Sequence, residues 1–231
     1  MIRMILIGGG SSSGKSYLTS NVIEKVGKDN ITRISVDDYY KDQSNISLKD
    51  RYGVNYDHPK AFDWPLIRSQ LKDLKEGKTI QKPVYDFVTL TRTNKVEEVK
   101  PSSLIVVEGI MALVDKEIRD MADLKVFIDA SAERRFLRRM IRDSRERGRT
   151  FENIVNQYFS TVQPMHDEIV KPSSIYADLI VSNDGVKNRA IDVLACLFNE
   201  ELNASRNSSP ILKAQEEEFN EDILSQVFGN K

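Results

Sequence analysis

The stretch Gly9-Gly10-Ser11-Ser12-Ser13-Gly14-Lys15-Ser16 decides the fold of this chain. It follows the apolar run 4–7, and residues from Tyr17 onward can continue as a helix. A glycine-rich loop between a strand and a helix lets backbone N–H groups and the positive end of the helix dipole face phosphate oxygens. Lys15 is expected to reach the β- and γ-phosphates of a nucleotide, and Ser16 to ligate Mg²⁺.

Apolar runs alternate with helical patterns along the rest of the chain. We expect strands at 3–8, 31–35, 104–108, 125–129 and 178–181, and helices at 15–26, 65–75, 132–145, 151–170 and 188–199. Strands separated by helices predict an α/β fold, a P-loop NTPase-type parallel sheet flanked by helices. Residues 79–100 are rich in Val and Thr and predict a small antiparallel β insertion beside the ligand crevice.

Length and charge exclude several classes of protein. The 231 residues fit one domain, and a net charge of −1 gives no global field that would draw the chain to nucleic acid or to an anionic membrane. No apolar stretch approaches the ~20 residues of a membrane span. The single cysteine, Cys196, cannot form a disulfide within the chain, so we expect a cytoplasmic protein, with Cys196 buried in a helix.

The C-terminal residues differ from the rest. We expect one kinase-like domain over 1–200 and a separate tail over 201–231, beginning with a turn-forming stretch at 203–210. Phe219, Ile223 and Val227 then recur at helical spacing and form an amphipathic stripe. Residues 200–231 hold seven acidic and three basic side chains, a net charge of about −4. The tail either packs on its own subunit, frays in solution or docks a partner.

Two aspartates follow the second expected strand, in Ile34-Ser35-Val36-Asp37-Asp38-Tyr39-Tyr40. Transfer of a γ-phosphate to a hydroxyl requires a carboxylate that orients the hydroxyl and accepts its proton. Asp37 and Asp38 are the candidates, because the carboxyl end of this strand lies beside the phosphate-binding loop. The alternative role is capping of the following helix, and we expect one aspartate to take each role.

Glu108 ends the apolar run 104–107 and precedes Gly109. An acid at this point, next to a phosphate-binding loop, can hold a water molecule bound to Mg²⁺. A role in the turn is the alternative.

Arginine dominates the stretch 133–149, which contains eight arginines and no lysine. Arg135, Arg138, Arg139 and Arg142 recur at i, i+3, i+4 and i+7, and Phe136, Leu137, Met140 and Ile141 line the opposite face. We expect the apolar face to pack on the domain and the arginines to point outward. Arginine in place of lysine favours bidentate contacts with phosphate.

Several longer motifs resemble the uridine kinase (uridine–cytidine kinase) family of P-loop nucleoside kinases. They are DDYYKDQS at 37–44, NYDHPKAFD at 55–63, PVYDF at 83–87, VEGI at 107–110, RDSRERGR at 142–149, VQPM at 162–165 and YADLIV at 176–181. The resemblance runs from the phosphate-binding loop to about residue 188. It implies ATP-dependent phosphorylation of the 5′-hydroxyl of uridine and cytidine to UMP and CMP, with ATP or GTP as donor, Mg²⁺ as cofactor and a homotetramer as assembly.

The resemblance also implies roles for individual residues. Asp37, Lys15 and Arg142 would act in catalysis, and residues 138–150 would form a lid over the phosphates. The implied ATP site comprises Gly9, Gly10, Ser11, Ser12, Ser13, Gly14, Lys15, Ser16, Tyr17, Arg147 and Arg149; the implied nucleoside site comprises Tyr40, Tyr56, Asp57, Tyr85, Phe87, Arg139 and Gln157. Asp57 would hold the two ribose hydroxyls. The alternatives are an Asx-turn for Asp57 and core packing for the aromatic residues.

One position departs from the family pattern. Where the family usually has a histidine that contacts the edge of the pyrimidine, this chain has Leu90, which can neither donate nor accept a hydrogen bond. A kinase of another ribonucleoside or small hydroxyl metabolite therefore stays open. A nucleotide-sensing P-loop protein without catalysis, whose acidic tail helix recruits a partner, is a second alternative. His58 is expected to be structural, and His166 is given no role.

Overall fold

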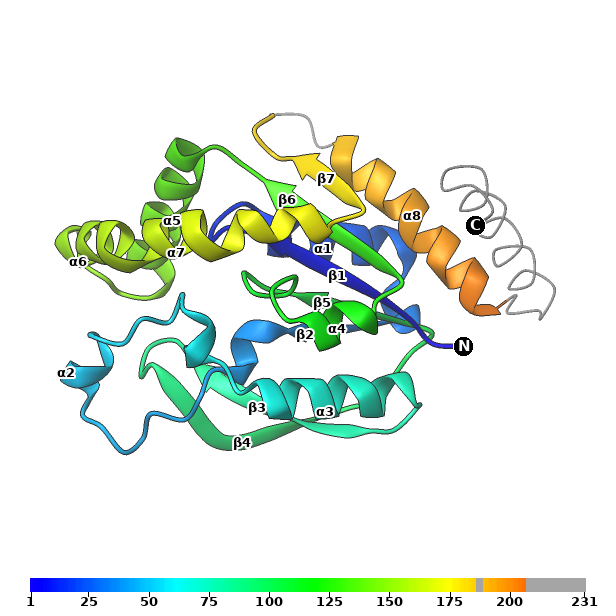
Figure 1. Cartoon of the computed structure of the whole chain (residues 1–231), viewed down its shortest axis with the longest axis horizontal. Coiled ribbons are helices and arrows are strands. Elements are labelled where there is room, and N and C mark those ends of the chain that lie inside the picture. The colour runs from blue at the N-terminus through cyan, green and yellow to red at the C-terminus, as the bar shows by residue number, and fades with distance from the viewer. Residues whose placement is uncertain (186–188, 207–231) are drawn as a thin grey trace, which may run out of the picture.

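The computed structural model describes residues 1–185 and 189–206 (Figure 1). Within these residues, a parallel sheet of five strands has the order β2 (Ile31–Ser35), β5 (Leu104–Glu108), β1 (Arg3–Gly9), β6 (Leu124–Asp129) and β7 (Leu179–Ser182). The apolar run that precedes the phosphate-binding loop forms the middle strand, where Ile5 lies opposite Val106 on one side and Leu124 on the other. A strand paired on both edges holds the loop that follows it in a fixed position.

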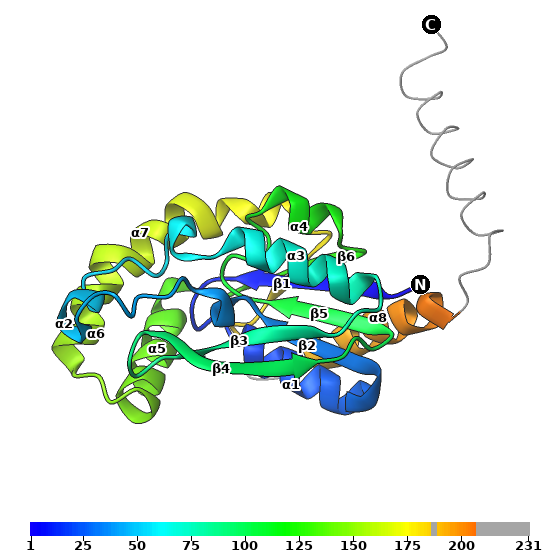
Figure 2. The same cartoon turned by 90° about the horizontal axis from the view of Figure 1, so that it is seen from below.

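Helices cover both faces of the sheet, as the alternating pattern predicts. Met4 and Leu6 point to the face covered by α3 (Trp64–Lys75) and α4 (Lys116–Asp120), and Ile5 and Ile7 to the face covered by α1 (Lys15–Val26) and α8 (Arg189–Arg206). Figure 2 shows these layers, with α3 and α4 above the sheet and α1 below it. The four β1 side chains are 0–1% exposed. The predicted α/β fold is confirmed.

The predicted antiparallel insertion is also present. It is a hairpin of β3 (Ile80–Asp86) and β4 (Thr91–Val99) with an irregular register between Pro83 and Tyr85. Proline has no N–H to donate to the partner strand, so the pairing is interrupted there. The connection ends at Leu90, whose φ of +56° lies in the left-handed region.

A long helical path begins beyond the ends of the strands and runs back over the face that α3 and α4 cover (Figure 1), where Val170 joins the core with Met4 and Leu6. After α5 (Ala132–Glu146), the chain forms α6 (Phe151–Gln157), two π-helical turns at Tyr158–Val162 and His166–Val170 around the short α7 (Gln163–Met165), and a last turn, Pro172–Tyr176. The expected single helix at 151–170 is therefore broken by π turns. Pro164 lacks the N–H that would reach the carbonyl of Ser160, which explains why the α-helical pattern fails here.

Three expectations about other elements were incomplete or wrong. The five-residue α4 and the four-residue α2 (Leu48–Arg51) were missed, because such short helices show no periodicity. Helix α8 continues to Arg206, so the residues at 203–206 are helical, and the expected domain end at residue 200 falls inside a helix. Cys196 is exposed, because α8 buries Leu194, Ala195, Phe198 and Leu202 instead.

The tail pattern that begins at residue 211 lies outside the described residues. Among the described helices, none combines the length and apolar character needed to cross a membrane.

Candidate active site

The phosphate-binding loop connects β1 to α1 and depends on its glycines. Gly9 and Gly14 have φ values of +139° and +96°, and a Cβ added to them would lie 2.3 Å from the Ile128 carbonyl oxygen and 2.1 Å from Asn183 Nδ2. Neither position accepts a side chain without displacing its neighbours. Lys15 is buried, and its Nζ donates a 2.9 Å hydrogen bond to the carbonyl of Gly10.

The loop borders a cavity of about 280 Å³, which we call the loop pocket. The predicted residues Ser11, Ser12, Gly14, Lys15, Ser16 and Tyr17 line it, together with Ser35, Asp37, Glu108, Gly109, Ile110, Arg138 and Arg142. Arg138 stabilises the loop, because its guanidinium donates hydrogen bonds to the carbonyl oxygens of Ser13, in the loop, and of Asn183. Arg147 and Arg149, expected at the ATP site, do not line the loop pocket.

The two residues expected at the metal lie together. Ser16 Oγ donates a 2.9 Å hydrogen bond to Glu108 Oε2, while Arg33 holds Oε1 of the same carboxylate through Nε and Nη2. Hydroxyl and carboxylate oxygens are ligands that suit Mg²⁺. The oxygens of Ser16 and Glu108 would therefore suit a divalent cation such as Mg²⁺.

A second cavity, of about 50 Å³, lies beside the first, and we call it the aromatic pocket. The predicted residues Tyr40, Tyr56, Asp57, Tyr85, Phe87, Arg139 and Gln157 line it, together with Ser11, Asp37, Leu90, Ile110, Arg142, Arg147 and Arg149. Its volume is well below the ~300–1,000 Å³ of typical ligand sites, but it shares Ser11, Asp37, Ile110 and Arg142 with the loop pocket.

The aromatic residues pack on one another around Tyr40. Its ring centroid lies 5.5 Å from that of Tyr56 and 5.0 Å from that of Tyr85. Tyr56 Oη donates a 3.0 Å hydrogen bond to the carbonyl of Leu90, and the Leu90 side chain is buried in the same wall. The rings thus form a largely apolar wall, and the hydrogen bond from Tyr56 Oη fixes the end of the hairpin connection at Leu90.

Asp57 lies in this pocket and does not form the Asx-turn that was its alternative role. That turn is made by Asn55, whose Oδ1 accepts from the Asp57 N–H at 3.1 Å. Asp57 is 8% exposed, and burial raises the pKa of its carboxyl, against the opposing effect of Arg139 and Arg142. A buried carboxylate with cationic neighbours is available to accept hydroxyl donors.

Asp37 lies where the two pockets meet and lines both. It is half-buried, and its Oδ1 is shielded from solvent without a hydrogen-bond partner. Burial raises the pKa of Asp37, while Lys15 opposes the shift. One oxygen of the Asp37 side chain is thus available to accept a proton.

Neither aspartate caps a helix, contrary to expectation. The turn Val36–Tyr39 is capped by Ser35, whose side chain accepts from the Asp37 N–H. Asp38 pairs instead with Lys82 Nζ at 2.5 Å and so links the Asp37 turn to the β3–β4 hairpin.

The orientation of α5 is the reverse of the expected one. Arg135 and Arg139 are 4% and 5% exposed and face the phosphate-binding loop, whereas Leu137 and Ile141 are 58% and 45% exposed. Arg139 Nη1 donates a 2.8 Å hydrogen bond to Ser11 Oγ of that loop. The same buried face carries an acid, Asp143, that partly neutralises the arginines and lowers the cost of burying them, while Phe136 of the apolar face still packs on Tyr158.

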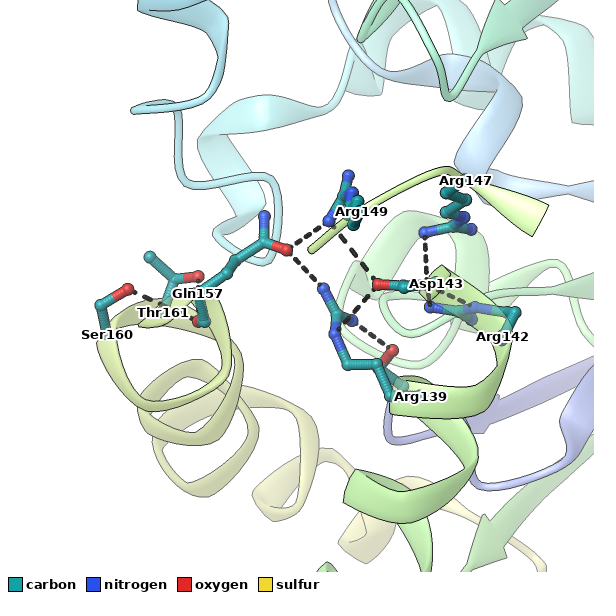
Figure 3. Close-up of polar contacts among 9 residues, drawn as sticks. Arg139, Arg142, Asp143, Arg147, Arg149, Gln157, Ser160 and Thr161 are labelled. Atoms are coloured by element: carbon teal, nitrogen blue, oxygen red, sulfur yellow. Dashed lines mark hydrogen bonds and ion pairs between the residues drawn. The ribbon is translucent and has the colours of Figure 1, made fainter. Parts of the chain in front are cut away.

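Asp143 was not singled out in the sequence. It is 0% exposed and forms ion pairs with Arg139, Arg142, Arg147 and Arg149 at 3.5, 2.8, 3.5 and 3.6 Å, as Figure 3 shows. Its signal in the sequence is the i, i+4 spacing to Arg139 and to Arg147.

The outer arginines reach the aromatic pocket. The Arg147 guanidinium lies 4.2 Å from the centroid of the Phe87 ring. Gln157 Oε1 accepts hydrogen bonds from Arg139 Nη2 at 2.8 Å and from Arg149 Nη1 at 2.5 Å. Arg147 and Arg149 therefore lie on the side of the aromatic pocket in this structure.

The two histidines differ in their surroundings. His58 Nδ1 accepts from the Lys60 N–H at 3.0 Å and caps the turn Pro59–Ala61, a structural arrangement. His166 is buried behind Gly10 with Nδ1 unpartnered, and burial, aided by Arg135, lowers its pKa to about 4.

Comparison with known proteins agrees with this geometry. The model of the phosphoribulokinase / uridine kinase family matches residues 4–190. The chain belongs to this family. It is 44% identical to a uridine kinase of Clostridium novyi, over 89% of this chain and 100% of the relative, and 46% identical to one of Deinococcus deserti, over 84% and 95%. The resemblance stated from the motifs is thereby confirmed.

Solved structures show the same fold at low sequence identity. A phosphoribulokinase from Rhodobacter spheroides aligns with a TM-score of 0.61 at 16% identity, covering 81% of this chain and 72% of that one. The structure of a putative fructose transport system kinase from Silicibacter sp. TM1040 gives a TM-score of 0.61 at 18% identity, covering 78% of this chain and 89% of that one. These likenesses bear on the fold alone.

Proposed function

We propose that this family member is an ATP-dependent kinase that phosphorylates the 5′-hydroxyl of uridine and of cytidine. One observation carries the proposal: Asp37 and Arg142 line both the loop pocket and the aromatic pocket. Transfer of a phosphoryl group from a nucleotide in the loop pocket to a hydroxyl in the aromatic pocket requires a base and a cation where the pockets meet. The relatives named uridine kinase support the choice of nucleoside.

The residues take the following roles in this proposal. Asp37 orients the 5′-hydroxyl and accepts its proton as the phosphoryl group moves. Lys15 and the loop amides hold the donor phosphates, and Arg142 stabilises charge on the transferred group. Asp57 accepts hydrogen bonds from the ribose hydroxyls, and the rings of Tyr85 and Phe87 contact the base.

Mg²⁺ is the cofactor in this proposal, held through Ser16 and Glu108. When bound, the ion neutralises charge on the transferring phosphates. The proposed enzyme uses ATP or GTP as the phosphoryl donor. We also propose a cytosolic homotetramer, for which the exposed apolar side chains of Leu137, Ile141 and Phe159 offer a contact surface.

Release of ADP from Mg²⁺-ATP tests the proposal, measured with uridine, cytidine, their 2′-deoxy forms, adenosine and guanosine. Turnover is expected on uridine and cytidine, weak on the deoxy forms and lost in Asp37→Asn. Turnover on a purine nucleoside alone would overturn the substrate assignment. ATP binding without turnover on any nucleoside would favour the nucleotide-sensing alternative.

A further inference from the structure

Four arginines and one buried carboxylate meet between the two pockets. Figure 3 shows Asp143 at the centre of this group, which we call the arginine cluster: Arg139, Arg142, Arg147 and Arg149 around Asp143. We propose that Asp143 is a positioning residue that holds these guanidiniums in the arrangement needed for phosphoryl transfer. The inference rests on the proposed function.

Asp143 acts through its neighbours, because it lines neither pocket and is 0% exposed. Each arginine in turn reaches a different part of the site. Arg142 faces both pockets, and Arg139 donates to Ser11 of the phosphate-binding loop. One carboxylate therefore joins the lid to the loop.

The remaining two arginines connect Asp143 to the nucleoside side. Arg147 lies over the Phe87 ring, and Arg149 donates to Gln157, which also accepts from Arg139. A shift of the Asp143 carboxylate would thus move arginines that contact both substrates. A displacement of about 1 Å can cost on the order of 100-fold in rate when reacting groups lose alignment.

Charge explains why an acid is needed at this point. Four guanidiniums so close together repel one another, and without a counter-charge their side chains would spread apart. Burial alone would raise the pKa of Asp143, but Arg142, Arg139 and Arg147 outweigh it and hold the pKa below its ordinary value. The carboxylate therefore stays ionised across the physiological range.

The same charge has an opposite effect on simple binding of phosphates. A negative group among the arginines weakens their attraction for ATP, while it fixes the geometry that transfer requires. If Asp143 is a positioning residue, removing its charge should lower kcat without lowering the affinity for ATP. Mere support of the fold predicts that both decline together with the melting temperature.

Asp143→Asn tests this, because the amide keeps the shape and removes the charge. We expect kcat to fall roughly 100-fold, with Mg²⁺-ATP, titrated calorimetrically without nucleoside, bound at least as tightly as by the wild type. Asp115→Asn is the matched control: Asp115 pairs with Arg68 through Nε at 3.2 Å and Nη2 at 2.5 Å and lines neither pocket. It is expected to keep wild-type kcat.

Wild-type kcat in Asp143→Asn, or a parallel loss of kcat, ATP affinity and melting temperature, would overturn the inference. Asp143→Glu provides a second test if the asparagine variant does not fold, since it keeps the charge but moves it by one methylene group. Lower kcat with unchanged ATP affinity is expected, and wild-type kcat would count against the inference. Failure of the wild type to phosphorylate uridine would instead count against the proposed function, whereas the ATP titrations still test Asp143.

Discussion

Ser16 Oγ and Glu108 Oε2 are joined by a 2.9 Å hydrogen bond, although 92 residues separate them in the sequence. The contact arises because β1, which leads into the phosphate-binding loop, pairs with β5, which ends at Glu108. The parallel sheet thus places a hydroxyl and a carboxylate at one edge, where a divalent cation can use both.

Glu108→Gln is predicted to raise the Mg²⁺ concentration needed for half-maximal activity by about 10- to 100-fold, the usual effect of losing a residue that supports a metal site. The amide retains the shape of the side chain but loses its charge. Titration of activity with Mg²⁺ at fixed ATP measures the change. Glu117→Gln is the control, because Glu117 pairs with Arg68 on the surface; an equal shift in both variants would contradict a specific role for Glu108.

Asp37→Asn is predicted to abolish turnover and to raise the melting temperature. The folded protein raises the pKa of Asp37, mainly through burial, so the native state binds its proton more tightly than the unfolded chain. The free energy of unfolding therefore decreases as the pH rises through the native pKa. At neutral pH the ionised carboxylate of Asp37 destabilises the native state. A higher melting temperature than that of the wild type is expected by thermal denaturation at pH 7.

Asp115→Asn should show the opposite sign in the same measurement. There the Arg68 partner and the Ile118 N–H outweigh burial and lower the pKa of the carboxyl, so its ionised form stabilises the native state. A lower melting temperature for Asp37→Asn than for the wild type would refute the argument from burial.

Leu90→His is predicted to increase discrimination in favour of uridine. Leu90 is buried in the aromatic pocket and offers the base no hydrogen bond. One hydrogen bond of ~0.5–1.5 kcal/mol corresponds to a gain of about 2- to 10-fold in kcat/KM for uridine over adenosine. Leu90→Met is the apolar control, and an unchanged ratio in Leu90→His would show that this position does not contact the base edge.

The sequence predicted the sheet well because each of its buried strands is a short apolar run, and β1, β2 and β5 begin and end within one residue of expectation. It predicted the wrong burial for α5, because amphipathicity identifies two faces without saying which is buried. The usual rule puts apolar side chains inside. Here the arginine face is buried against the loop, where Arg139 bonds Ser11 and the buried carboxylate of Asp143 offsets part of the charge.

The end of β2 predicted where Asp37 lies, but it could not show which role Asp37 takes and which role Asp38 takes. Both aspartates follow the same strand, and the choice depends on Lys82, which the hairpin brings from 44 residues away. Asn55 likewise takes over the Asx-turn that might have occupied Asp57. Such assignments depend on long-range partners that spacing along the chain does not reveal.

The pH dependence of kcat/KM is predicted to be bell-shaped, with both limbs set by residues of the site. Asp37 must be ionised to accept a proton, and burial raises its pKa, so the acidic limb lies above the ordinary 3.8 of an aspartate. Lys15 must be protonated to hold phosphate, and burial lowers its pKa despite Asp37 and Glu108, so the basic limb lies below 10.5.

Lys15→Arg separates the two limbs. Arginine stays protonated across the accessible range, so the residual activity of the variant should keep the acidic limb and lose the basic one. Initial rates at subsaturating uridine, taken between the ordinary pKa values of the two groups, 3.8 and 10.5, measure both. A basic limb that persists unchanged in Lys15→Arg would assign it to another group and would remove Lys15 as its cause.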